Sequence, residues 1–257
     1  MGKGDAGEPY ERKCIWNQRN PVKKFMFTSD EIDRHKQDRK KWHDFVRRRE
    51  AEIAFFAFAN TKFHIALELG AGDGGQSVTI SQYCENLICT DKDAKSHAWL
   101  GQTILERQLA NVEYKLCDAQ DLSQFEDGTF NLIFSSNLFE HVPDIRKCLK
   151  EYKRVLRDDG IMLHTMPSRW WKFFSFILSI VRLKLPGIHG VTASQWQEFN
   201  AFGIKVWKKT IESLDLNVTE IIGLPFYVGH GNQFIPVIKA GNALKISASY
   251  LYVIKKR

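Results

Sequence analysis

Two carboxylates frame a run of glycines, and this arrangement suits the binding of a nucleoside. Glu68 lies just before the sequence GAGDGG, which begins at Gly70, and Asp91 follows it. Only glycine lets a turn approach a ligand closely with positive φ. An acid about 20 residues later, at the tip of the next strand, can accept both hydroxyls of a ribose. The stretch 63–91 is therefore predicted to bind a nucleotide-like ligand.

Glu68 decides between the two kinds of ligand that the glycine spacing allows. Glycines 70, 72 and 75 fit G-x-G-x-x-G, whereas glycines 70, 72 and 74 fit G-x-G-x-G. A carboxylate beside the turn would repel the pyrophosphate of a dinucleotide. It would suit a cationic ligand, such as the ammonium group of a methionine moiety. A glycine turn without any ligand is the alternative.

The elements that must position these acids alternate along the chain. Apolar runs that read as strands occur at 65–69, 87–90, 112–116 and 161–166, with a further strand ending at Ser136. Helical patterns separate them, at 94–108 and 144–156 among others. Strands at 218–223 and 249–254 close the chain. This alternation predicts an α/β fold with a parallel sheet.

Several ordered motifs resemble those of the class I S-adenosylmethionine (SAM)-dependent methyltransferases of the type 11 group. They are ELGAGDG from Glu68, DAQDL from Asp118 and LFEHV ending at Val142, within a region from Phe63 to Pro167. The resemblance implies a Rossmann-like fold, with a seven-stranded, mostly parallel sheet and helices on both faces. It also implies SAM as cofactor and methyl transfer as activity. Asn131 and Asp158-Asp159 depart from the family pattern.

The resemblance assigns cofactor contacts to residues at the carboxyl ends of the strands. Asp118 would accept from the adenine amino group, with a turn cap as the alternative reading, and Asp121 is read as a cap. The full cofactor set comprises Glu68, Gly70, Ala71, Gly72, Gly74, Asp91, Lys92, Asp118, Ala119 and Asn137.

Histidines supply the candidate bases. If the acceptor is a hydroxyl, removing its proton calls for a group that titrates near neutral pH. His141 follows the fourth strand, where this fold places the reacting methyl, although it could instead cap the next helix. His189, in a glycine-flanked loop, is the second candidate. Tyr227 and His230 are candidates for acceptor binding, whereas His164 is expected in the core.

Charge and cysteine content limit which partners and which cellular compartment are expected. Residues 161–257 hold 12 Lys and Arg against 4 Asp and Glu, which suggests an anionic partner or simply a solvated face. Five cysteines without a C-x-x-C pair predict reduced thiols. The N-terminus has no apolar signal core. A cytoplasmic protein is expected, with the alternative of a peripheral location on the inner face of the membrane.

The predicted domain at 60–257 follows one extension and contains two inserted segments. Residues 1–59 form a tail and a helical extension, and 225–247 form a long connection. Residues 168–192 form an amphipathic insert with a narrow polar stripe, which includes Lys172 and Ser179, and a wide apolar face. The insert is too short to span a bilayer. Residues 169–185 could lie in the membrane interface, cover a substrate pocket or form a homodimer contact.

The acceptor is the open question. We expect O-methylation of a sugar in a surface glycan or of a lipid-linked intermediate. The alternatives are C- or O-methylation of a quinone or other lipid, and a non-catalytic SAM-binding factor. Ser136–Phe139 does not match the motif of nucleic-acid amino-methyltransferases, so nucleic acid is not the expected acceptor. The sequence offers no metal-ligand spacing, and no metal is predicted.

Overall fold

The computed structural model describes residues 28, 30–31, 34, 39–181, 187–225, 228–230, 233–235 and 246–257. Within them, seven strands form one sheet in the order β3-β2-β1-β4-β5-β9-β6. The strands are β1 Phe63–Leu69, β2 Cys84–Asp91, β3 Val112–Leu116, β4 Phe130–Ser136, β5 Leu156–Pro167, β6 Leu216–Gly223 and β9 Ser249–Lys256. β9 is antiparallel to both of its neighbours, whereas the pairs among β1 to β5 are parallel. The predicted Rossmann-like class is confirmed.

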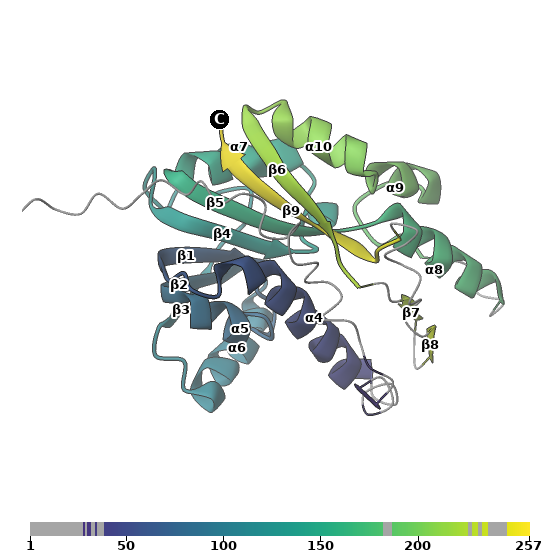
Figure 1. The fold of residues 1–257 in the computed structure, drawn as a ribbon, viewed down its shortest axis with the longest axis horizontal. Helices are drawn as coiled ribbons and strands as arrows, with labels where there is room; N and C mark the ends of the chain where they lie inside the picture. Colours follow the sequence, from purple (N-terminus) through teal and green to yellow (C-terminus); the bar gives the residue numbers. More distant parts are fainter. Residues whose placement is uncertain are drawn as a thin grey trace, which may run out of the picture.

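Helices cover both faces of this sheet (Figure 1). One face carries α4 Arg39–Phe55, α5 Ser77–Ile80 and α6 Ala94–Arg107, and the other carries α7 Ile145–Val155 and α10 Ile204–Glu212. Alternate side chains of β1 belong to the hydrophobic cores on the two faces of the sheet. Ala66 packs on the α4 side, while Leu67 and Leu69 pack on the α7 side. The remaining elements are η1 Phe56–Phe58, η2 Ser81–Tyr83, η3 Phe139–His141, α8 Arg169–Val181, α9 Gln195–Ala201, β7 Val228–His230 and β8 Gln233–Ile235.

The strand order creates a crevice at the carboxyl ends of β1 and β4. β1 pairs with β2 on one side and with β4 on the other, so the chain leaves these strands in opposite directions. Ligands of open α/β sheets bind at such a switch point. The glycine turn follows β1, and His141 follows β4. The fold therefore brings these two sequence features to one edge.

The fifth strand begins earlier than the sequence indicates. The helix predicted over 144–156 ends at Val155, and Leu156 already pairs with Phe130. Leu156 is fully buried, and its pairing commits the chain to the sheet. The residues before Ile161 form an irregularity in the register, and Gly160 lies inside the strand instead of ending a helix.

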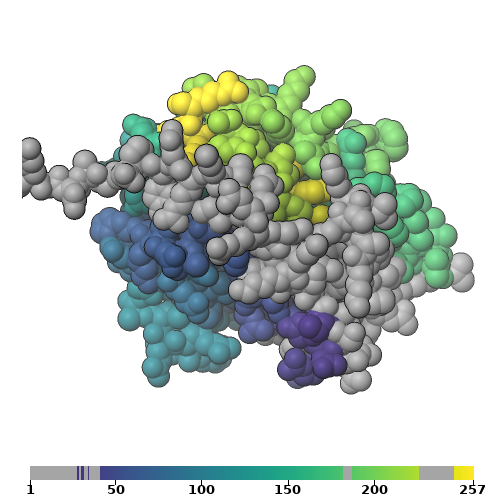
Figure 2. All heavy atoms as spheres, in the orientation of Figure 1, coloured from purple at the N-terminus to yellow at the C-terminus, as the bar shows by residue number. Residues whose placement is uncertain are grey.

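The polar stripe of α8 faces inward, and its apolar face is exposed. Lys172 and Ser179 are only 5% and 8% exposed, whereas Phe173 is 43% and Ile180 55% exposed. The cause is an ion pair between Lys172 and the buried carboxylate of Glu198 in α9. α8 lies at an edge of the molecule (Figures 1 and 2), which leaves its apolar residues on the outside. Within the described ranges, no helix combines the length and apolarity that crossing a bilayer requires.

Replacing Lys172 by Met is expected to lower the free energy of unfolding by about 3–5 kcal/mol, because it leaves the Glu198 carboxylate buried without its cation. Adding Glu198→Gln removes that charge while keeping a carbonyl oxygen, so the double variant is expected to recover part of the loss. Urea unfolding measures both values. Lys208→Met, which removes one partner of the more exposed pair with Glu212, is the matched control and is expected to cost less than about 1 kcal/mol. A double variant no more stable than Lys172→Met would refute the assignment.

Candidate functional site

The turn after β1 needs glycine for two different reasons. Gly70, Gly72 and Gly74 all adopt the left-handed conformation, with φ of +69°, +58° and +80°. A Cβ on Gly74 would lie 2.3 Å from Cδ1 of Leu100, so this glycine permits close packing against α6. A Cβ on Gly72 would meet nothing within 4 Å. The backbone at Gly72 is therefore open to a ligand.

Asp91 is oriented by two backbone donors. The Gly72 N–H donates to Oδ2 of Asp91 at 3.0 Å, and the Asp93 N–H donates to its other carboxylate oxygen at 2.9 Å. The end of β2 is thereby tied directly to the glycine turn. Each carboxylate oxygen keeps a further lone pair, so Asp91 can still accept from ribose hydroxyls.

Glu68 lies in a different place from the one that the sequence analysis expects. Strand alternation places it on the α4 side of the sheet, where it is buried and does not line the cavity described below. Ser77 Oγ donates to Oε2 of Glu68 at 2.5 Å, and Cys89 Sγ donates to the same oxygen at 3.2 Å. Burial raises the pKa of Glu68 to about 7. In this structure the residue joins β1, β2 and α5, and its contact with an ammonium group stays a prediction.

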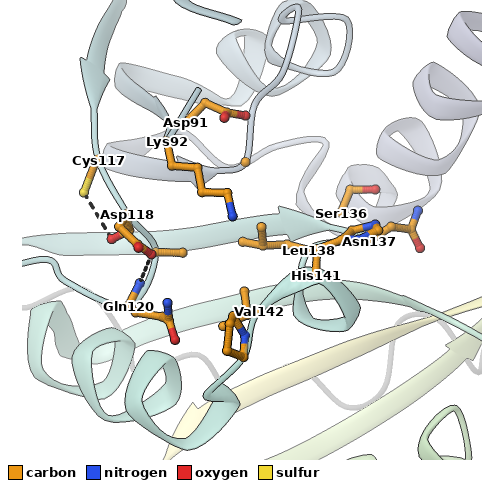
Figure 3. Close-up of a pocket in the computed structure, with 13 residues that line it drawn as sticks. Asp91, Lys92, Cys117, Asp118, Gln120, Ser136, Asn137, Leu138, His141 and Val142 are labelled. Carbon is orange, nitrogen blue, oxygen red and sulfur yellow. Dashed lines mark hydrogen bonds between the residues drawn. The ribbon is translucent and has the colours of Figure 1, made fainter. Parts of the chain in front are cut away.

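A cavity of about 230 Å³ lies between the glycine turn and the end of β4. Figure 3 shows Asp118 and Gln120 on one side of it and Ser136, Asn137 and His141 on the other. The structure thus brings together six of the ten predicted cofactor residues with the first candidate base. The lining residues are Gly70, Asp91, Lys92, Cys117, Asp118, Ala119, Gln120, Ser136, Asn137, Leu138, His141, Val142 and Pro143.

The acids and glycines of this cavity suit an adenosine-containing ligand. Asp118 Oδ1 accepts from the Gln120 N–H at 2.8 Å, which fixes the carboxylate at the rim. It stands at the opposite side of the cavity from Asn137 (Figure 3). Asp91 and Asp118 can accept from the ribose and from the adenine amino group, and Gly72 leaves room for the backbone approach. SAM therefore fits the donors and acceptors present.

His141 and His189 meet beside the cavity. Their ring centroids lie 5.0 Å apart, and the Trp171 ring of α8 lies 5.0 Å from His189. Burial lowers the pKa of His141, and the Lys92 ammonium lowers it further. Burial and the proximity of His141 lower the pKa of His189 to about 4. Both imidazoles are therefore neutral at pH 7 and able to accept a proton.

The other predicted side chains are placed less fully. His164 is buried in β5 and shares a hydrogen bond of 2.7 Å with Ser135, as expected for a core residue. Tyr227 lies outside the described residues. His230 belongs to β7, but only its backbone is described. Their roles in acceptor binding stay predictions.

Two charged residues near the histidines, Glu140 and Arg47, received no role in the sequence analysis. Glu140, next to His141, is 4% exposed, and burial raises its pKa to about 8. Arg47 of α4 pairs with Glu50 at 2.7 Å. With its amide oxygen turned toward Arg47, Asn137 accepts from Nη2 at 2.8 Å. Glu140 belongs to the LFEHV motif, but its burial beside His189 and the contact of Arg47 with Asn137 depend on the fold.

Comparisons with known proteins identify the same region. A family model described as a methyltransferase domain matches residues 67–164. The chain is 28% identical to the uncharacterized methyltransferase YcgJ of Bacillus subtilis over 138 residues, which cover 52% of this chain and 54% of that protein. It is 24% identical to the mitochondrial ubiquinone biosynthesis O-methyltransferase of Bos taurus, over 70% of this chain and 50% of that protein. The chain thus spans about half the length of these two relatives.

Solved structures share the fold. The crystal structure of B. subtilis YcgJ superposes with a TM-score of 0.56 at 15% identity, covering 81% of this chain and 99% of that chain. A SAM-dependent methyltransferase from Aquifex aeolicus superposes with a TM-score of 0.56 at 13% identity, covering 89% and 98%. At these identities the likeness concerns the fold.

The raised pKa of Glu68 predicts a pH dependence of stability. Its folded pKa of about 7 exceeds the ordinary value of 4.5, so its stabilising contribution is fully present below pH 4.5 and is lost as the pH rises through 7. Glu68→Gln keeps an acceptor for Ser77 and Cys89. Relative to this variant, the wild type is expected to lose up to about 3 kcal/mol of unfolding free energy between pH 4.5 and 8.

Urea unfolding at each pH measures that difference. Glu113→Gln, at an exposed carboxylate in β3, is the matched control and should track the wild type. Parallel pH profiles for the wild type and Glu68→Gln would contradict the buried protonated state.

Gly72→Arg is expected to weaken SAM binding by more than about 100-fold, or about 2.7 kcal/mol, because the side chain fills the open approach. Gly128→Arg is the matched control, since Gly128 has a similar φ of +63° and open surroundings but lies outside the turn whose backbone contacts Asp91. Isothermal calorimetry measures both affinities. Equal SAM affinity in a folded Gly72→Arg variant would remove the cofactor from this turn.

Proposed function

Because the chain belongs to the class I SAM-dependent methyltransferase family, we propose that it methylates a hydroxyl group of a lipid or lipid-linked acceptor. The observation that carries this proposal is the position of His141. It lies at the edge of the predicted cofactor cavity and also against His189, which contacts α8. An acceptor held between α8 and the cavity would therefore reach the transferable methyl group past His141.

The residues of the chain supply alignment and proton removal. Bound SAM provides a methyl group that its sulfonium already activates for displacement. Asp91 and Asp118, which accept from backbone N–H groups, would hold the ribose and the adenine of the bound cofactor. His141, which lines the cavity and contacts His189, would accept the proton of the acceptor hydroxyl. Alignment and exclusion of water then account for much of the rate.

The exposed face of α8 supports an amphiphilic acceptor. Its outward residues form an apolar surface on the helix that also carries Trp171, and Trp171 contacts His189. An apolar helix face of this kind can lie in a membrane interface, and the basic C-terminal third favours an anionic surface. We take the surface to contact lipid. The exposed side chains are Trp170, Phe173, Phe176, Ile177, Ile180 and Val181.

Two acceptor types fit this arrangement. The first is a sugar hydroxyl in a surface glycan or a lipid-linked intermediate, for which the membrane contact would bring the enzyme to its substrate. The second is a quinone-type lipid, which the resemblance to a ubiquinone biosynthesis O-methyltransferase favours. Both present a hydroxyl oxygen close to a membrane surface.

Transfer of labelled methyl from SAM into a fractionated cell extract tests the proposal. Label in the lipid extract, or in material released from it by mild acid, is expected. Label in nuclease-sensitive material would contradict it. No label in any fraction, with SAM binding measured separately, would replace it by a non-catalytic SAM-binding factor.

His141→Ala is expected to lower kcat by about 10²–10⁴-fold while SAM affinity changes little, because the imidazole acts on the acceptor proton. Single-turnover rates and calorimetry measure the two quantities. His64→Ala is the matched control, because His64 is exposed near the start of β1, at the opposite end of the strand from the cavity. Unchanged turnover in His141→Ala would show that His141 is not the catalytic base.

A further inference from the structure

One carboxylate and two imidazoles converge next to the cofactor cavity. A ligand atom from each of Glu140, His141 and His189 lies within 4.8 Å of the other two. Two histidines and a carboxylate form a common set of protein ligands for divalent transition metals. The sequence hid this set, because His189 is remote from the other two residues along the chain.

Of the three side chains, Glu140 is the one that most clearly lacks a bonding partner. It is 4% exposed, and neither of its carboxylate oxygens has a hydrogen-bond partner within the described part of the chain. The nearest basic atom recorded is Nε2 of His189, at 3.9 Å from Oε1. A buried carboxylate without hydrogen bonds is costly unless it pairs with a cation or coordinates a metal.

The nearby described cations are paired with other carboxylates, and the charge of Arg47 only partly offsets the effect of burial on the pKa of Glu140. Arg47 is bound to Glu50 at 2.7 Å, and Lys172 is bound to Glu198. A divalent ion held by Glu140 and the two imidazoles would give this buried carboxyl group the partner that the described residues do not provide.

The loop that carries His189 is fixed against Glu140. The N–H groups of His189 and Gly190 both donate to Oε1 of Glu198 at 2.6 Å, and the Val191 N–H donates to the Glu140 carbonyl at 2.9 Å. A Cβ on Gly190 would lie 2.4 Å from that same carbonyl oxygen. Glycine at this position thus allows the close contact. These bonds fix the backbone that carries His189 beside Glu140.

We propose that Glu140, His141 and His189 form a binding site for a divalent transition-metal ion that holds the acceptor hydroxyl beside the cofactor. Metal bonds to imidazole and carboxylate of about 2.0–2.2 Å place ligand atoms about 3.0–3.5 Å apart. The Glu140 and His189 atoms are 3.9 Å apart and the three ligand atoms lie within 4.8 Å of one another, so binding would need them to approach by about 0.5–1.5 Å. A side-chain rotation of His189, which is partly exposed, can provide this.

The ion would change how the hydroxyl is activated. This part rests on the proposed function. A bound hydroxyl loses its proton more easily because the metal stabilises the alkoxide or phenolate, and the proton passes to water. The oxygen then displaces the methyl group from the sulfonium, forming an ether and leaving a neutral thioether. Because three protein ligands leave coordination positions open, the site suits an acceptor with two neighbouring oxygens, such as a sugar diol or a catechol.

Cobalt(II) titration of the untagged full-length protein tests the site without measuring activity. The wild type is expected to bind one Co²⁺ with visible ligand-field absorption. Glu140→Gln and His189→Asn are each expected to weaken binding by about 100-fold or more. His64→Asn is the matched control, since it removes an exposed histidine that lies 2.6 Å from a carboxylate, and it should bind as the wild type does. SAM affinity of each variant verifies folding.

A ligand exchange makes the test independent of stability losses. His189→Cys should retain Co²⁺ and gain a thiolate-to-cobalt charge-transfer band, which appears only if residue 189 touches the ion. The proposal is overturned if the wild type binds no Co²⁺, or if Glu140→Gln and His189→Asn bind it as tightly as the wild type. It is also overturned if the cysteine variant binds Co²⁺ without that band.

Failure of the proposed function is separable from failure of the site. Cobalt binding with no methyl transfer would leave the metal site standing and refute the activity. Methyl transfer by a protein that binds no Co²⁺ would support the activity and refute the metal site. Competition by a sugar diol and by a catechol, observed as changes in the cobalt spectrum, distinguishes the two acceptor chemistries.

Discussion

The buried ion pair between Lys172 and Glu198 determines how the C-terminal half is arranged around the sheet. It fixes α8 with its polar stripe inward, because a lysine without its carboxylate partner could not remain buried there. Glu198 then uses its second oxygen to hold the backbone of His189 and Gly190. The exposed apolar face of α8 and the meeting of His189 with His141 are thus two consequences of one interaction.

The cofactor side of the site depends on a different kind of constraint. Backbone N–H groups, rather than charges, orient Asp91 and Asp118, and left-handed glycines give the turn its shape. This half uses short-range contacts within neighbouring loops of the sheet edge. His141 belongs to both halves, since it lines the cavity and touches His189. Methyl transfer is accordingly expected at His141, where the cofactor cavity meets the segment that carries α8 and His189.

This division explains what the sequence could predict. The α/β class and the placement of Asp91, Asp118 and His141 at one edge of the sheet follow from periodicity and from the rule that parallel strands share a carboxyl edge. The sequence could not predict that the polar stripe of α8 faces inward, since a helical pattern shows two faces without saying which one is covered. Glu68 shows the same limit within a strand, because the pleat that carries it to the α4 side becomes clear only with the helices in place.

A crystal structure of the wild type with S-adenosylhomocysteine, soaked in Mn²⁺ and recorded for anomalous scattering, tests the central claim most directly. The claim is that the reacting sulfur faces the place where His141 and His189 converge. The account predicts ribose at Asp91, adenine at Asp118, and an anomalous peak bounded by Glu140, His141 and His189 on the sulfur side of the ligand. A sulfur atom pointing away from His141, or a peak elsewhere with these three side chains unengaged, would contradict it.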